Sequence, residues 1–290
     1  MATPQLSKLS FYRRGRTTLY ASRYDQRFSY CCYVPESYDE EAQDVYPLTV
    51  LIHHTGRTAS LLRDEFVDFA EANQCIVLAP LFPSGIIHPN DLNNYKHVLY
   101  HGIRYDLVLL DMIEEISAIY RIHADKFLMH GFSGGGQFVH RFLYLHPRRL
   151  MGVSVGAPGT VTLPDDDKDW WIGTRGMEER FGIKLDVDAL RSVPVQLVIG
   201  DKDVETWEVT VRSTSNFWME GINDTGETRI DRLRALQMGL ESLGVKTRFD
   251  FVPGVAHQGV LIQEPVKAFF AEALSQYRKR VELIAARPPA

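Results

Sequence analysis

Cysteine is scarce in this sequence of 290 residues, which contains only Cys31, Cys32 and Cys75. Cys31 and Cys32 are adjacent in an apolar stretch that we expect to form a strand. Neighbouring side chains of a strand point to opposite faces, so these two thiols are badly placed to bond with each other. We therefore expect three reduced thiols, packed as small apolar groups, which favour a cytoplasmic protein.

Long apolar runs are also missing. The most apolar stretch near the middle of the chain, residues 107–120, is interrupted by Asp111, Glu114 and Glu115, which argues against a membrane span. Residues 1–15 lack the apolar core of a signal peptide. We therefore expect neither secretion nor a membrane partner.

No charge of one sign dominates the sequence. The chain has 32 Lys and Arg against 37 Asp and Glu, which gives a formal net charge of −5. The short basic run at 278–280 is typical of a solvated helix end, so there is no electrostatic reason to expect a nucleic-acid partner. With 45% hydrophobic residues, the chain can bury a sizeable core as a globular protein.

Short apolar runs alternate with stretches of helical spacing. From residue 48 onward the alternation is regular, and because parallel neighbours need crossover helices, it predicts a mainly parallel, doubly wound sheet. The first two or three runs have no helix between them and suit an antiparallel edge. The expected strands are 8–14, 28–34, 48–54, 75–80, 126–131, 150–155, 195–200 and 247–252, and the expected helices are 60–73, 103–120, 135–146, 230–244 and 265–286.

Two polar, turn-rich segments interrupt this alternation, at about 157–190 and about 204–228. Each follows an expected strand, so both should project from the carboxyl edge of the sheet, where such folds bind ligands. We interpret the first segment, which carries Trp170 and Trp171, as a lid. The chain has no internal repeat or evident linker, so a single domain, residues 1–290, with an insertion is the simplest organisation.

Residues 131–135 read Gly-Phe-Ser-Gly-Gly, which fits the pattern G-x-S-x-G. An apolar run precedes the pattern and a helical stretch follows it, as expected for a nucleophile elbow with Ser133 at the apex of a sharp turn. The flanking glycines lack the Cβ atoms that would collide across such a turn. The serine would then stand at a helix N-terminus, where free N–H groups favour developing negative charge.

A serine hydroxyl is a weak nucleophile until a base removes its proton, so a histidine and an orienting carboxylate are needed. His257 follows the expected strand 247–252, and Asp201 and Asp203 follow another expected strand. These side chains therefore belong to the sheet edge that carries Ser133, where hydrogen bonds between them can form. Either aspartate could instead cap a turn, the commonest role of Asp at a strand end.

Over about residues 28–275 the chain resembles the α/β-hydrolase superfamily. The resemblance rests on the serine elbow, the acid loop, the histidine loop and the segment Leu-Ile-His-His-Thr-Gly-Arg at 51–57. It implies the α/β-hydrolase fold, with about eight mostly parallel strands, helices on both faces and a lid. In that family the acid commonly holds the last position of G-x-x-D, which favours Asp203 over Asp201.

The resemblance also implies an oxyanion hole, a pair of backbone N–H groups that bind the negative oxygen of the transition state. Related esterases and depolymerase-like hydrolases carry His-Gly-x after the corresponding strand, where His53, His54 and Thr55 stand here. By this match the donors are the N–H groups of Gly134 and Thr55. His54 replaces the glycine, and we interpret His53 and His54 as hydrogen-bonding supports of the loop.

Several aromatic residues are candidates for the wall of the substrate pocket. Trp170 and Trp171 either wall an apolar pocket or form the core of the lid itself. Phe132, next to the serine, and His54 are further candidates for the pocket wall.

His97 and His101 are four residues apart and would share one face of a helix, as a metal pair does. No glutamate accompanies them in an H-E-x-x-H pattern and no third ligand is evident, so no metal site is predicted. The alternative, a metal-dependent hydrolase built on these histidines, would lose its activity to a chelator.

The sequence thus predicts a serine hydrolase that cleaves a carboxylic ester, such as a small-molecule ester, a lactone or a polyester fragment. Ser133, His257 and Asp203 would act through an acyl-enzyme and need no cofactor. The resemblance favours the esterase and polyhydroxyalkanoate-depolymerase-like branch. The alternatives are an amide or peptide hydrolase, an acyltransferase, or a ligand-binding protein on the same fold that does not turn over its ligand.

Overall fold

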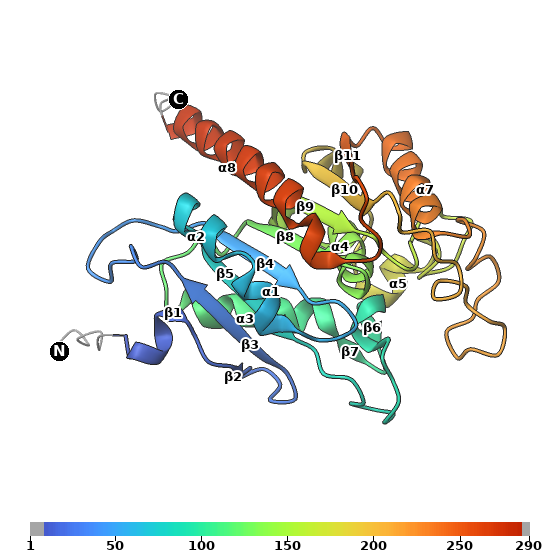
Figure 1. Ribbon diagram of the computed structural model, residues 1–290, viewed down its shortest axis with the longest axis horizontal. Coiled ribbons are helices and arrows are strands. Elements are labelled where there is room, and N and C mark those ends of the chain that lie inside the picture. The colour runs from blue at the N-terminus through green and yellow to red at the C-terminus, as the bar shows by residue number, and fades with distance from the viewer. Residues whose placement is uncertain (1–8, 286–290) are drawn as a thin grey trace.

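A twisted sheet of nine strands forms the centre of the molecule, which a computed structural model describes for residues 9–285 (Figure 1). The strand order is β1-β3-β5-β4-β8-β9-β10-β11, and β2 also pairs with β3. The strands are β1 (Gly15–Arg16), β2 (Tyr20–Ala21), β3 (Ser29–Val34), β4 (Leu48–Ile52), β5 (Ile76–Leu81), β8 (Phe127–Phe132), β9 (Leu150–Gly156), β10 (Val195–Gly200) and β11 (Thr247–Val252), and a separate hairpin joins β6 (Leu99–Tyr100) to β7 (Ile103–Arg104).

The direction of the strands follows the predicted division of the sheet. Strand β3 pairs antiparallel with β1, β2 and β5. Every pairing from β5 to β11 along the sheet is parallel. The predicted sheet of about eight mostly parallel strands with an antiparallel edge is therefore confirmed.

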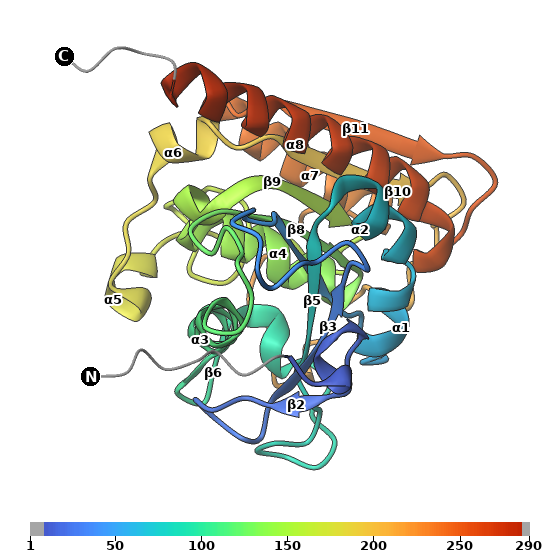
Figure 2. The ribbon, with the colours of Figure 1, turned by 90° about the vertical axis from the view of Figure 1, so that its left-hand side faces the viewer.

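Helices cover both faces of the sheet (Figure 2). On one face, Phe69 of α2 contacts Phe270 of α8. On the other, Tyr105 of α3 and Phe138 of α4 both contact Phe82, and α7 packs against β10 and β11. The helices within residues 9–285 are α1 (Ala59–Asp64), α2 (Val67–Asn73), α3 (Tyr105–Ser117), α4 (Gly134–Leu145), α5 (Met177–Phe181), α6 (Val187–Arg191), α7 (Arg229–Ser242) and α8 (Gln263–Ala285). In this range every helix is too short or too polar to traverse a lipid bilayer.

Strand β8 and the helix α4 that follows it are buried along their whole lengths. Phe142 of α4 packs between Phe127 of β8 and Phe138, with ring centroids 6.0 Å away in each case. Burying a side chain of this size stabilises the fold by about 1.5–3 kcal/mol. The turn that joins β8 to α4 is therefore held between two of the best-packed elements of the protein.

The expected strand at 8–14 is wrong. Phe11–Arg13 form the short 3₁₀ helix η1, and residue 8 lies outside the described residues. Phe11 and Tyr12 are 85% and 66% exposed, so this apolar run finds no sheet face on which to bury itself. The backbone then turns at Gly15, with φ of +57°, into the short strand β1.

The expected helix at 60–73 forms two helices, α1 and α2. At Phe66 the backbone leaves the helical region, with φ of −109° and ψ of 11°, and the side chain is fully buried. The apolar spacing correctly predicted the buried face, but spacing alone does not show that the chain bends at Phe66 to bury that ring.

The two irregular segments leave the sheet after β9 and β10. The segment 157–190 contains α5 and the start of α6, and Trp170 packs on Phe181 of α5 with ring centroids 4.8 Å apart. The segment 204–228 is made of turns and irregular structure throughout. Both follow strands of the parallel part of the sheet, at its carboxyl edge.

We expect Phe142→Ala to lower the free energy of unfolding by about 3–5 kcal/mol, because it empties a fully buried site between β8 and α4. The matched control is Met238→Ala on α7, whose side chain is 70% exposed. Urea denaturation followed by circular dichroism measures both variants. Equal losses in the two would contradict the assignment of the β8–α4 contact to the core.

Candidate active site

Ser133 lies at the sharp turn between β8 and α4. Its backbone angles are φ 56° and ψ −113°, and a non-glycine residue with such a positive φ is strained by about 1–3 kcal/mol. A Cβ atom built on Gly131 would overlap the carbonyl group of Gly135, and one built on Gly135 would overlap the carbonyl oxygen of Ile52. The two glycines of the motif therefore have a steric cause, because only glycine lets the backbone pass this closely.

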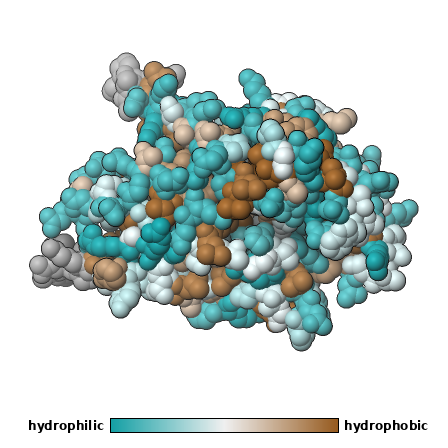
Figure 3. All heavy atoms as spheres, viewed as in Figure 1, coloured by the Kyte–Doolittle hydropathy of each residue, from teal (hydrophilic) through white to brown (hydrophobic). Residues whose placement is uncertain are grey.

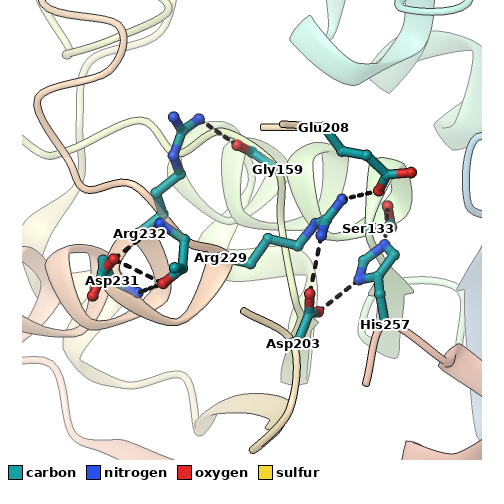
Figure 4. A network of polar contacts seen from close by, with 9 residues as sticks. Ser133, Gly159, Asp203, Glu208, Arg229, Asp231, Arg232 and His257 are labelled. Carbon is teal, nitrogen blue, oxygen red and sulfur yellow. Dashed lines mark hydrogen bonds and ion pairs between the residues drawn. The ribbon is translucent and has the colours of Figure 1, made fainter. Parts of the chain in front are cut away.

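His257 connects Ser133 to Asp203 (Figure 4). Its Nε2 lies 3.0 Å from Ser133 Oγ, and its Nδ1 lies 2.6 Å from Asp203 Oδ2. A carboxylate only accepts, so Nδ1 carries the proton and Nε2 is left to accept from the serine hydroxyl. The three side chains come from the carboxyl ends of β8, β10 and β11, and both distances are those of hydrogen bonds.

The two aspartates that follow β10 have different partners. Asp203 is almost fully buried, with 1% of its surface exposed, and it contacts His257. Asp201 instead accepts a hydrogen bond of 2.7 Å from the backbone N–H of Gly254, in the loop that leads to His257. One aspartate therefore orients the imidazole, and the other holds the loop that carries it.

Arg229, at the start of α7, neutralises the buried carboxylate of Asp203. Its Nη1 lies 2.9 Å from Asp203 Oδ1, and its Nη2 lies 2.5 Å from Glu208 in the segment 204–228 (Figure 4). The position of Arg229 is fixed by a capping box, in which Thr228 and Asp231 each bond to the backbone of the other. The second oxygen of Asp203 is thus held by a guanidinium that is itself 4% exposed.

Two backbone N–H groups next to Ser133 have no acceptor in the described part of the chain. They belong to Gly134, the first residue of α4, and to Thr55, in the loop after β4. The two residues are close, because a Cβ atom on Gly134 would lie 3.0 Å from Thr55 Oγ1. Free donors at a helix N-terminus favour a negatively charged oxygen at this point.

His53 and His54 support the loop that carries Thr55. Burial lowers the pKa of His53 to about 3, and the neutral ring donates from Nδ1 to the carbonyl of His54 and accepts the N–H of Phe82 at Nε2. Burial, and secondly the charge of His257, lower the pKa of His54. His54 accepts the N–H of Gly56 at Nδ1, so its ring closes the turn after β4.

An apolar compartment of about 530 Å³ opens on one side of Ser133. Its wall includes Leu61, Leu62, Phe132, Val260 and the rings of His54 and His257. Figure 3 shows apolar side chains gathered on this face, near the start of α8. Glu65 also lines the compartment, and burial raises the pKa of its carboxyl group, so this side of the site disfavours negative charge.

A smaller polar compartment, of about 150 Å³, lies beside α4. It is lined by Lys96 and His97 of the 3₁₀ helix η2 (Asn94–His97), by Gln137 of α4, and by Trp171, Glu208 and Phe217 from the two irregular segments. Lys96 reaches the nucleophile region, because a Cβ atom on Gly134 would lie 2.9 Å from Lys96 Cε.

The residues predicted to line the substrate pocket therefore lie in different places. Phe132 and His54 line the apolar compartment, and Trp171 lines the polar one. Trp170 lines neither compartment, because it is 5% exposed and packs inside the segment 157–190. Trp170 thus packs inside its own segment, whereas Trp171 lines the polar compartment and not the apolar one.

His97 and His101 do not share a helix face. His97 ends η2, and His101 lies in a turn with φ of 48°. Within residues 9–285, no group of three or more His, Cys, Asp or Glu side chains is placed to hold a metal ion.

Three functional candidates, Lys96, Glu208 and Arg229, were missed from the sequence. Lys96 and Glu208 lie in stretches without regular periodicity, and Arg229 is one of several arginines around helix α7. The only local signal was Thr228 with Asp231, a capping pattern that fixes where the helix begins.

No protein-family model and no curated protein sequence matches this chain. Solved structures do match. A poly(aspartic acid) hydrolase-1 from Sphingomonas sp. KT-1 has a TM-score of 0.69 and 20% identity, over 88% of this chain and 98% of that one. A poly(3-hydroxybutyrate) depolymerase from Bordetella parapertussis has a TM-score of 0.66 and 23% identity, over 85% and 86%. An S-formylglutathione hydrolase from Agrobacterium tumefaciens has a TM-score of 0.58 and 14% identity, over 93% and 98%.

This chain has the α/β-hydrolase fold. The three bonded residues follow one another along the chain in the order Ser133, Asp203, His257, each after a strand of the sheet, which is the order in which α/β-hydrolases carry nucleophile, acid and base. The α/β-hydrolase sheet thus accounts for the convergence of three side chains that are up to 124 positions apart.

We expect Arg229→Met to lower the free energy of unfolding by about 3–5 kcal/mol, because it leaves the buried carboxylate of Asp203 without its cation. The matched control is Arg175→Met, which removes an ion pair with Asp169 whose side chains are both 56% exposed and should change stability little. Urea denaturation at pH 7 compares the two. A similar small effect of both substitutions would show that Arg229 does not stabilise the buried acid.

Proposed function

We propose that this protein hydrolyses a carboxylic ester through a covalent acyl-enzyme on Ser133. The observation that carries the proposal is the single imidazole of His257, which bonds to Ser133 Oγ on one side and to Asp203 on the other. A serine in this arrangement loses its proton as it attacks, and the free N–H groups of Gly134 and Thr55 stand beside it for the resulting oxyanion.

The first half of the reaction forms the acyl-enzyme. Ser133 Oγ bonds to the ester carbonyl carbon, its proton passes to Nε2 of His257, and the carbonyl electrons move to the oxygen facing Gly134 and Thr55. Asp203 holds the imidazole and stabilises its positive charge. The tetrahedral intermediate then collapses, the bond to the alcohol oxygen breaks, and that oxygen takes the proton from His257.

The second half of the reaction hydrolyses the acyl-enzyme and regenerates the free serine. A water molecule gives a proton to Nε2 of His257 and bonds to the acyl carbon, which forms a second oxyanion in the same position. The bond to Ser133 Oγ breaks, the serine regains its proton from His257, and the carboxylic acid leaves. The protein supplies every acid, base and donor in this scheme, so the scheme uses no cofactor.

The shape of the site and the comparisons support an ester as the substrate. The apolar compartment beside Ser133 suits the hydrocarbon part of a small ester, a lactone or a polyester fragment. Two of the similar structures are named as a poly(3-hydroxybutyrate) depolymerase and a ferulic acid esterase, the latter with a TM-score of 0.55 and 18% identity. Three free and buried cysteines fit the cytoplasmic location that we propose for the enzyme.

We expect Ser133→Ala to abolish ester hydrolysis and labelling by a fluorophosphonate probe, while the circular dichroism spectrum stays unchanged. The measurement is turnover of a panel of aryl esters, lactones and amides with graded acyl size. The matched control is Ser60→Ala, an exposed serine on α1 away from the turn. Hydrolysis of amides but not esters would overturn the ester assignment, and full activity of Ser133→Ala would overturn the mechanism.

We expect Asp203→Asn to lower kcat about a thousandfold or more, because an amide does not stabilise the imidazolium and can favour the wrong tautomer. Asp201→Asn should stay within a few-fold of the unchanged enzyme, because its amide oxygen can still accept the N–H of Gly254. Steady-state kinetics on one aryl ester compares the two variants. A larger loss in Asp201→Asn would reassign the acid.

A further inference from the structure

Lys96 is a buried cation without a counter-ion. Its side chain lines the polar compartment, the residue is 6% exposed, and it forms no ion pair with any described residue. Within residues 9–285 the only hydrogen bond from Nζ goes to Oδ1 of Asn93, at 2.7 Å. Two of the three ammonium protons therefore have no acceptor among the described residues. A buried ammonium lowers the stability of the fold unless an anion accepts hydrogen bonds from it.

The surroundings of Lys96 add positive rather than negative charge. Arg141 lies behind the compartment and is fully buried. Its guanidinium donates hydrogen bonds to neutral oxygens, among them the carbonyl of Lys96 at 2.7 Å. Arg57 also acts on Lys96 by repulsion, and Asp91 is the carboxylate that acts on it by attraction, from beyond ion-pair distance. The interior of the polar compartment therefore carries an excess of positive charge.

His97 supplies a second unsatisfied group in the same compartment. Its Nδ1 is shut off from solvent and has no partner among the described residues. Burial lowers its pKa well below the usual value, so the ring is neutral, and it lies against Trp171 and Phe217 with centroids 4.2 and 5.2 Å away.

Glu208 is the one carboxylate that lines the polar compartment, and it does not fill the role of counter-ion. It is paired with Arg229 at 2.5 Å, and its side chain is 40% exposed. Arg229, which is shared with Asp203, thus holds Glu208, and no ion pair joins Glu208 to Lys96 among the described residues.

We propose that the polar compartment binds a carboxylate carried by the ester substrate, with the ammonium of Lys96 as its anchor. The proposal rests on the function proposed above and names its substrate class: esters whose acyl or alcohol part ends in a carboxylate. The scissile carbonyl then lies at Gly134 and the carboxylate at Lys96, since these two residues are in near contact. The hydrocarbon part of the ester then lies in the apolar compartment.

The test compares isosteric esters that differ in charge. For a carboxylate in the acyl part, monoethyl succinate is paired with ethyl 4-methylpentanoate. For a carboxylate in the alcohol part, carboxymethyl butyrate is paired with isobutyl butyrate. We measure kcat/KM for each ester by titration of the released acid, in the unchanged protein, in Lys96→Met and in the surface control Lys246→Met.

We expect the unchanged protein to prefer the anionic ester at least tenfold in one of the two pairs, and the pair identifies the part that carries the carboxylate. Lys96→Met should reduce this preference tenfold or more, whereas Lys246→Met, which removes an exposed cation, should keep it. The preference is a ratio within one protein sample, so a partly unfolded variant does not change it.

Two results would overturn the inference. One is the absence of an anionic preference in the unchanged protein, and the other is an equal loss of activity on both esters of a pair in Lys96→Met. In either case turnover of the neutral esters that depends on Ser133 would leave the proposed function standing. Turnover of none of the four esters would count against the proposed function itself.

The pH profile gives an independent readout. Burial, and secondly the charge of Arg57, lower the pKa of Lys96 to about 8. The cation exists below this pKa, so the preference should be complete near pH 6.5 and should decline as the pH rises from 8 to 9. Burial keeps His97 neutral over this range. Burial also lowers the pKa of Arg141 to about 9, so any charge that Arg141 loses above pH 8 weakens the preference for an anion in the same direction. A preference that rises with pH would contradict the role of Lys96.

Discussion

The close passage of α4 across the end of the sheet is the constraint on which the site depends. Gly131 and Gly135 allow the backbones to touch, and this contact holds Ser133 at a positive φ between two buried elements. The strain at the serine, about 1–3 kcal/mol, is offset by the burial of β8 and α4 on either side of it. At the same turn Gly134, the first residue of α4, lies close to Thr55, so one packing contact positions both the proposed nucleophile and the proposed oxyanion donors.

Charge is distributed around this turn in a fixed pattern. A buried carboxylate, Asp203, is held between an imidazole and a guanidinium, and this accounts for the presence of Arg229 in the interior. The apolar compartment beside Ser133 and the polar compartment lined by Lys96 then differ in the charge that they favour. On the apolar side the pKa of Glu65 is raised by burial, whereas on the polar side Lys96 stands without a counter-ion. The two compartments therefore differ in charge as well as in hydrophobicity.

Sequence patterns predicted those parts of the site that depend on local geometry. The G-x-S-x-G motif, the alternation of strands and helices, and the positions of His257 and Asp203 after strands all follow from short-range rules. The two compartments could not be predicted in this way, because their walls come from loops whose meeting depends on tertiary packing. Trp170 and Trp171 are adjacent and chemically alike, yet one packs in its own segment and the other lines the polar compartment. The strand expected at 8–14 was a wrong prediction for the same reason, since apolar spacing does not show whether a sheet face is free to pair with it.

The core holds the serine turn and the loops form much of the compartment walls, and this separation has an evolutionary consequence. The serine turn is fixed by β8 and α4, whereas much of both compartment walls belongs to segments outside the sheet, among them 157–190 and 204–228. Insertions and substitutions in such segments can reshape what enters the site while the core that holds the serine turn keeps its stability. New specificities can thus arise on this framework through changes in its loops, while the packed strands and helices that hold the serine turn are kept.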